Sequence, residues 1–99
     1  MTHSDDRKVT KVPQVLVQDL DGEAVLLNLD NGQYYGLDEV GFRMYQLLVA
    51  SNSVGDAYKA LLEEYEIAPE QLCADLEALL VDLLKHGLVV ECLIPAGAS

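Results

Sequence analysis

The chain has 99 residues, of which 51% are hydrophobic, and a formal net charge of −11. This length supports one hydrophobic core, so we expect a single domain. Seventeen acidic residues against six basic ones give a surface that repels phosphate backbones and anionic lipid headgroups. We therefore expect no nucleic-acid partner and no membrane partner.

The cysteines and the apolar tracts indicate the compartment. Cys73 and Cys92 have no CxxC spacing, and the N-terminal sequence MTHSDDRKVTK lacks the apolar stretch of a signal peptide. Charged residues interrupt the most apolar tract, LEALLVDLLKHGLVV, well before the ~20 uncharged residues that a membrane span requires. We expect a cytoplasmic protein.

The first third of the chain predicts a small sheet. Residues 1–11 are polar and without periodicity, which predicts a flexible arm. Three strand-like runs follow, VLVQDL (15–20), AVLLNL (24–29) and QYYGL (33–37), and they predict a three-stranded antiparallel meander. We expect Asn31-Gly32 to form a two-residue hairpin loop, since such loops need positive φ angles.

Three helices are predicted after the strands, with N-terminal signals at Asp38, Ser53 and Pro69 and a stop signal at Gly87. Residues at helical spacing that should face the core are Val40, Met44, Leu47, Leu48, Ala57, Leu61, Tyr65, Leu72, Leu76, Leu79 and Leu83. Residues 88–93 would form a short strand or an extended tail. We assign residues 12–93 to one folded domain and residues 94–99 to a disordered tail.

The fold class is therefore α+β, with a three-stranded antiparallel sheet followed by a three-helix bundle. The second and third helices, joined by a bend at residues 66–68, resemble a helix-turn-helix unit with the hairpin as its wing. A winged-helix DNA-binding regulator is thus the alternative function. The third helix argues against it, because it presents Glu70, Asp75, Glu77 and Asp82 against Lys85.

We predict no enzyme activity, no cofactor and no metal site. The sequence contains no HExxH, P-loop or GxSxG pattern. Cys73, among leucines, is interpreted as a small buried apolar residue, and His86 as a residue that satisfies the end of a helix.

The Tyr34-Tyr35-Gly36 run is the strongest candidate site. If sheet order follows the meander, it lies on an edge strand whose free N–H and C=O groups no Lys, Pro or bulge protects. It is either a docking edge for a peptide or simply the last part of the core, with Gly36 as a kink into the helix. A third possibility is an edge that a fixed partner or a second copy of the chain covers.

The third helix supplies the other side of a candidate groove. Cys73, Leu80 and Leu84 widen its apolar arc beyond the core stripe, while Asp75 and Asp82 line the opposite margin. A peptide could enter by strand addition, with the acids attracting Lys or Arg. The pattern does not decide which margin faces the groove.

Two segments, GEAVLLNLDNGQYYGLDEVGFRMYQLL and EYEIAPEQLCADLEALLVDLLKHGLV, resemble the PqqD-like family. The resemblance covers about residues 15–90. It implies a winged-helix-like domain that binds the leader segment of a ribosomally made precursor peptide as an added strand beside strand three, in the cleft with helix three. LLNLDNG and LDEVG stand where proteins of quinone synthesis carry LLYPEG and LN-x-TA, so the chain is more similar to stand-alone leader-binding proteins of lasso peptide biosynthesis.

The resemblance also implies partners and site residues. The partners would be the leader segment and a separate leader peptidase or radical SAM modifying enzyme, with the chain itself a monomer or weak dimer. The implied peptide-binding residues are Tyr34, Tyr35, Gly36, Leu37, Asp75, Leu79, Asp82 and Leu83.

Overall fold

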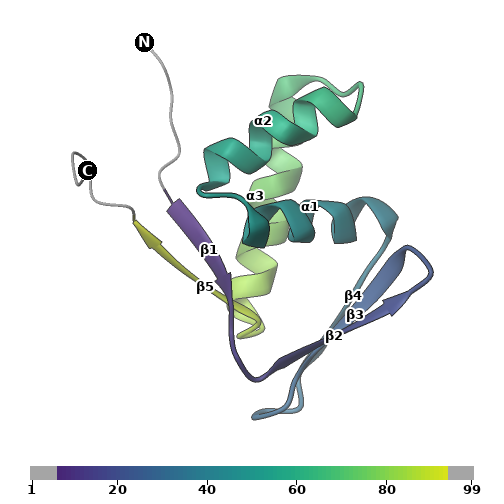
Figure 1. The fold of residues 1–99 in the computed structure, drawn as a ribbon, viewed down its shortest axis with the longest axis vertical. Coiled ribbons are helices and arrows are strands. Elements are labelled where there is room, and N and C mark those ends of the chain that lie inside the picture. The colour runs from purple at the N-terminus through teal and green to yellow at the C-terminus, as the bar shows by residue number, and fades with distance from the viewer. Residues whose placement is uncertain (1–6, 94–99) are drawn as a thin grey trace.

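The computed structural model describes residues 7–93. Its elements are β1 (Arg7–Lys11), β2 (Val15–Leu20), β3 (Glu23–Asn28), β4 (Tyr34–Leu37), α1 (Glu39–Ala50), α2 (Val54–Glu64), α3 (Pro69–Lys85) and β5 (Val89–Leu93). Strands β2, β3 and β4 form an antiparallel sheet in that order, and β1 pairs with β5 in a separate two-stranded ribbon. The helices lie on one side of the sheet, and α3 runs between the ribbon and the sheet (Figure 1). The predicted α+β fold is confirmed.

The prediction of a flexible arm is wrong for residues 7–11, which form β1. Val9 is fully buried in the core, and it pairs with Glu91 of β5. Lys8 Nζ donates hydrogen bonds to the carbonyls of Val49 and Ser51 and so satisfies the C-terminal end of α1. One apolar residue among charged ones leaves no periodicity for sequence reasoning to detect. Residues 1–6 and the predicted tail at 94–99 lie outside the described residues.

The two-residue hairpin loop is at Asp21-Gly22, not at Asn31-Gly32. Leu20 pairs directly with Glu23, and both turn residues have positive φ, 63° and 98°. At the second hairpin the Asn28 N–H donates to Gln33 O, so a longer loop of residues 29–32 closes it. In this loop Gly32 is the residue with a positive φ. The Asn28 side chain accepts bonds from the N–H groups of Asp30 and Asn31, and these bonds hold the rest of the loop in shape.

The helix boundaries follow the predicted signals. Asp38 and Ser53 accept hydrogen bonds from the N–H groups of Gly41 and Asp56, as N-caps do. At the end of α3, Gly87 has a φ of 69°, its N–H donates to Leu84 O, and the Leu88 N–H donates to Leu83 O. This is a Schellman motif, which reverses the chain so that β5 can return along α3.

The predicted core stripes are largely confirmed. All four core positions of α3 are buried, as are Met44, Leu48, Ala57 and Leu61, while Leu47 and Tyr65 pack against this cluster as partly buried side chains. Val40 is the exception, because it is 44% exposed at the start of α1. An apolar side chain thus remains at the surface directly after β4.

Candidate functional site

Strand β4 is an edge of the sheet, as the meander predicts. Because hydrogen-bonded pairs alternate in an antiparallel ladder, the Asn28–Gln33 bond makes Leu26–Tyr35 and Ala24–Leu37 the bonded pairs. The N–H and C=O groups of Tyr34 and Gly36 therefore point away from β3. No partner for these groups occurs among residues 7–93. The β4 edge can accept another strand.

The side chains of β4 alternate between solvent and the protein interior. Tyr34 is 71% exposed, and no atom lies within 4 Å of a Cβ built on Gly36. Tyr35 is half-buried, and Leu37 is buried in the core. A strand beside β4 would thus meet open space at Gly36, next to the exposed Tyr34 ring on the same face of the sheet.

Tyr35 connects β4 to α3. Its hydroxyl donates a hydrogen bond to Asp82 Oδ2 at 3.0 Å, and its ring lies 5.0 Å from the His86 ring between centroids. His86 is the C-cap of α3, and its Nδ1 lies 2.8 Å from the Asp82 carbonyl oxygen. This contact fixes the C-terminal half of α3 beside the edge strand.

The contact also identifies the margin of α3 that faces β4. On a helical wheel Asp75, Leu79 and Asp82 share the side of His86, so this is the margin that turns to Tyr35. Leu80 and Leu84 lie on the opposite margin with Glu77, which forms an ion pair with Arg7 of β1. Of the extra apolar residues noted in the sequence, Leu80 is buried and Leu84 packs against the core, whereas Cys73 is exposed. None of the three lies on the margin that turns to Tyr35.

The predicted site residues differ in what a ligand could reach. Asp75 and Asp82 are half-exposed, and Leu79 retains 8% of its surface at the margin of the core. Leu37 is nearly and Leu83 completely buried, so these two side chains support the site from beneath. The groups that a ligand could reach are the backbone of Tyr34 and Gly36, the Tyr35 ring, Leu79 and the two acids.

Asn28 positions the sheet against α3, and sequence reasoning did not single it out. It is the one buried polar residue among residues 7–93, and its Nδ2 donates to Gly87 O at 2.8 Å. Its Oδ1 accepts the two loop N–H groups described above. The signal available in the sequence was a lone Asn on the apolar face of a strand, which needs internal partners when buried.

Carboxylates surround the contact between Tyr35 of β4 and α3. Burial raises the pKa of the Tyr35 hydroxyl, and the hydrogen bond to Asp82 and the charges of Asp82 and Asp38 raise it further. Asp75 adds another carboxylate on the same margin, where its Oδ1 accepts a bond from Gln71. A cationic side chain would be favoured at this position and an anionic one disfavoured.

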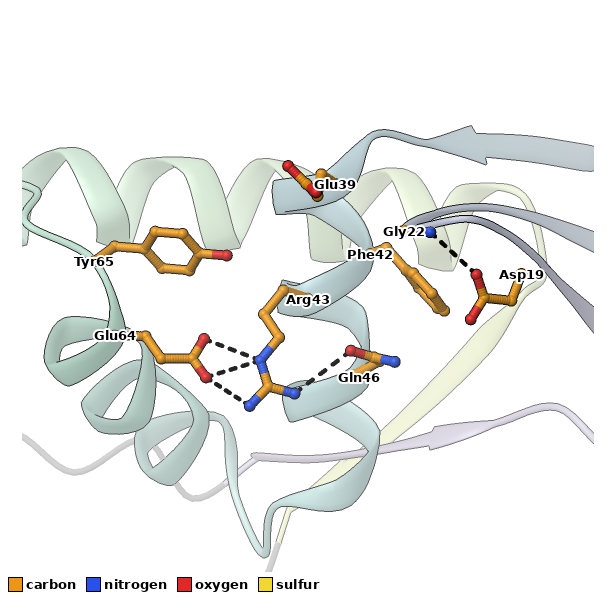
Figure 2. Close-up of a pocket in the computed structure, with 8 residues that line it drawn as sticks. All are labelled: Asp19, Gly22, Glu39, Phe42, Arg43, Gln46, Glu64 and Tyr65. Carbon is orange, nitrogen blue, oxygen red and sulfur yellow. Dashed lines mark hydrogen bonds and ion pairs between the residues drawn. The ribbon is translucent and has the colours of Figure 1, made fainter.

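A separate hollow of about 420 Å³ lies on another part of the molecule, between α1, the end of α2 and the β2–β3 turn. Figure 2 shows Arg43 of α1 reaching across to Glu64 of α2, with its Nε 2.8 Å from Oε1. This bond holds the pKa of Glu64 below its ordinary value. The hollow's one cation is thus already paired, and none of the predicted peptide-binding residues lines it.

Residues 7–93 contain no group of three His, Cys, Asp or Glu side chains that could hold a metal. Cys73 is exposed, contrary to the prediction of burial, because it follows the core residue Leu72 on the outer side of α3. No helix in the described range is long and apolar enough to cross a membrane. On α3, Lys85 is the single basic side chain, so the helix is unsuited to a recognition role.

Comparison with known proteins gives both a family and solved structures. The family described as coenzyme PQQ synthesis protein D (PqqD) matches residues 23–89. The structure of TbiB1 in complex with the TbiA(beta) leader peptide is 29% identical, covers 91% of this chain and 98% of that chain, and has a TM-score of 0.74. A lasso peptide synthetase B1 complexed with the leader peptide is 26% identical, with coverage of 84% and 98% and a TM-score of 0.74. The search of curated proteins gave no match.

Proposed function

This chain belongs to the PqqD family, and we propose that it is a binding protein, not an enzyme, for the leader segment of a ribosomally synthesised precursor peptide. The observation that carries the proposal is the open backbone edge of β4 beside the acidic margin of α3. Two similar structures, at 29% and 26% identity, hold a leader peptide. The leader would add to the sheet as a strand next to β4.

Backbone pairing alone is too weak to hold the leader. Tyr34 and Gly36 offer two N–H and two C=O groups, each worth ~0.5–1.5 kcal/mol net. Association costs about 4–15 kcal/mol, so buried anchor residues must supply the difference, at about 1.5–3 kcal/mol each. The leader should therefore carry spaced apolar side chains that enter the cleft near Tyr35 and Leu79. A Lys or Arg in the same segment would pair with Asp75 or Asp82.

The bound precursor would then be delivered to a separate enzyme. The similarity to a lasso peptide synthetase B1 favours a leader peptidase, and a radical SAM modifying enzyme is the other candidate. The encounter would take place in the cytoplasm, where ribosomes release the precursor. In this arrangement the chain contributes recognition and orientation, and the enzyme contributes the chemistry.

Titration of a fluorescently labelled leader peptide, followed by anisotropy, tests this function. The wild-type protein should bind saturably, and Tyr34→Pro should weaken binding at least about tenfold. The reason is that proline removes an outward N–H that no strand of the sheet uses, so the fold tolerates it. Tyr34→Ala is the matched control, because it removes the same side chain and keeps the N–H.

Circular dichroism should show that both variants are folded. Equal weakening by Tyr34→Pro and Tyr34→Ala would assign the loss to the tyrosine ring and contradict strand addition at this residue. No saturable binding by the folded wild-type protein would contradict the proposed function itself.

A further inference from the structure

The face of the sheet that points away from the helices is apolar and uncovered. We call it the outer sheet face and define it by Leu16, Leu20, Val25, Leu27 and Tyr34. The register places Leu16 opposite Leu27 and Leu27 opposite Tyr34, so the three side chains form a row across all three strands. Leu16 and Leu20 are each 50% exposed, and Tyr34 more so. Within residues 7–93 no helix or strand lies over this face (Figure 1).

Such a face differs from scattered surface leucines, because its members are neighbours on adjacent strands. The opposite face of the same strands is built from buried residues, among them Val15, Ala24 and Leu26, which pack under the helices. The register also places Gln18 and Glu23 on the outer face, opposite Val25 and Leu20. The five apolar side chains still make both sides of the sheet largely apolar, whereas an antiparallel sheet with one solvated side normally alternates apolar and polar residues. A contiguous exposed apolar patch indicates a contact surface.

The charges around this face indicate the kind of partner. Residues 15–37, which form the sheet and its loops, contain Asp19, Asp21, Glu23 and Asp30 and no Lys or Arg. A second copy of the chain would bring the same acids and a further net charge of −11 against them, which disfavours self-association. A surface with an apolar centre and a rim of Lys or Arg is complementary instead.

The outer sheet face is continuous with the candidate docking edge. Tyr34 belongs to both, since its backbone points away from β3 and its side chain stands on the outer face. A strand added beside β4 would place every second side chain on this same face, next to Tyr34. The leader would thereby become the fourth strand of a composite surface made of two chains.

We propose that the outer sheet face is the docking surface for the enzyme that acts on the bound precursor, and that this enzyme contacts β2–β4 and the added leader strand together. The inference rests on the proposed leader binding. It explains how one small domain selects its enzyme: leader and enzyme use the edge and the face of the same sheet, so the leader-bound form presents the larger contact surface. The enzyme's contact surface should be apolar at its centre and basic at its rim.

The test uses the full chain, the labelled leader and the purified processing enzyme encoded with them. Leu16→Lys places a cation in the middle of the outer sheet face, where an exposed side chain can change without loss of the fold. Val90→Lys is the matched control, because Val90 is similarly exposed, at 55%, but lies on β5 in the ribbon. Leader binding is measured first, by anisotropy, and enzyme binding to the leader-loaded protein second.

We expect Leu16→Lys to weaken enzyme binding about tenfold or more and to leave leader affinity within about twofold, while Val90→Lys changes neither. Enzyme binding that Leu16→Lys leaves unchanged would overturn the inference. Sedimentation that shows a wild-type dimer, dissociated by Leu16→Lys, would overturn it in favour of a second copy as occupant. Failure of the proposed function is separate, because it appears in the first titration as wild-type protein that does not bind the leader.

Discussion

The sheet has two edge strands, β2 and β4, and they are protected to different degrees. On β2, Lys11 Nζ donates to Val15 O at 2.9 Å, and the Val15 N–H donates to Val12 O at 3.0 Å. Farther along the same strand Asp19 places a charge at the edge. On β4, the residues Tyr34 to Leu37 include no charged side chain, and its outward groups have no partner within the described range.

Strand addition is therefore hindered at the Val15 end of β2 and open along β4. Lysine and inward-facing charge are common devices against unwanted pairing, and at the β2 edge Lys11 of β1 and Asp19 supply them. The edge without them is the one that Tyr35 and Asp82 hold against α3. An unprotected edge is a liability in general, so its presence beside the carboxylates of α3 favours a use for it.

The largest expected effect is that of Asn28→Ala, which loosens the attachment of the sheet, and with it both edges, to α3. The substitution leaves the Gly87 carbonyl and the loop N–H groups without their partner, which should lower the free energy of unfolding by about 2–3 kcal/mol. Urea unfolding measures the loss. Asn31→Ala, which removes only an exposed bond to the Gln33 N–H, should cost less than about 1 kcal/mol. Equal losses would show that Asn28 does not hold the sheet to α3.

A pair of prolines compares the two edges directly. Asp19→Pro and Tyr34→Pro each remove one N–H that points away from β3. Leader affinity should fall at least about tenfold for Tyr34→Pro and stay within about twofold of wild type for Asp19→Pro. Anisotropy titration gives both values. If Asp19→Pro were the more damaging change, the leader would add to β2 and the assignment of the edges would be reversed.

Tyr35→Phe tests the contact between β4 and α3. It removes the hydrogen bond to Asp82 and should cost about 1 kcal/mol or less of unfolding free energy at neutral pH, since the site is partly exposed. The raised pKa of Tyr35 adds a pH dependence. Because the folded-state pKa lies above the unfolded value, this stabilisation is complete below about pH 10 and is lost as the pH rises through the folded-state pKa.

Urea unfolding at neutral pH and at about pH 11 checks this expectation. The difference between wild type and Tyr35→Phe should shrink at the higher pH. A difference that stays constant would mean that Tyr35 does not titrate in this range. Tyr45, whose pKa burial also raises, is present in both proteins and cancels in the comparison.

The sequence predicted the unprotected edge correctly and missed the protection of the other. The absence of charge in YYGL can be read along the chain, and so can the caps at Asp38 and Ser53, because these are local properties. The guard on β2 comes from Lys11, in a segment whose pairing with β5 spans most of the chain and leaves no local pattern. The sequence did not predict which margin of α3 faces β4, because this depends on how the helix is rotated about its axis. The tertiary contact of Tyr35 with Asp82 fixes that rotation.

The smallest expected effect is at Gly36, where the contribution of β4 to stability can be separated from its proposed contribution to leader binding. A Cβ at this position meets no atom within 4 Å, and Gly36 is not among the residues with positive φ. Gly36→Ala should therefore raise the free energy of unfolding by about 0.4–1 kcal/mol, because it restricts the unfolded chain without straining the strand. If leader binding weakens in the same variant, the added strand approaches the sheet closely enough that glycine is retained for docking. A variant that is more stable and binds equally well would show that glycine is not needed there, and that the leader's grip comes from the outward backbone groups and the cleft beside Tyr35.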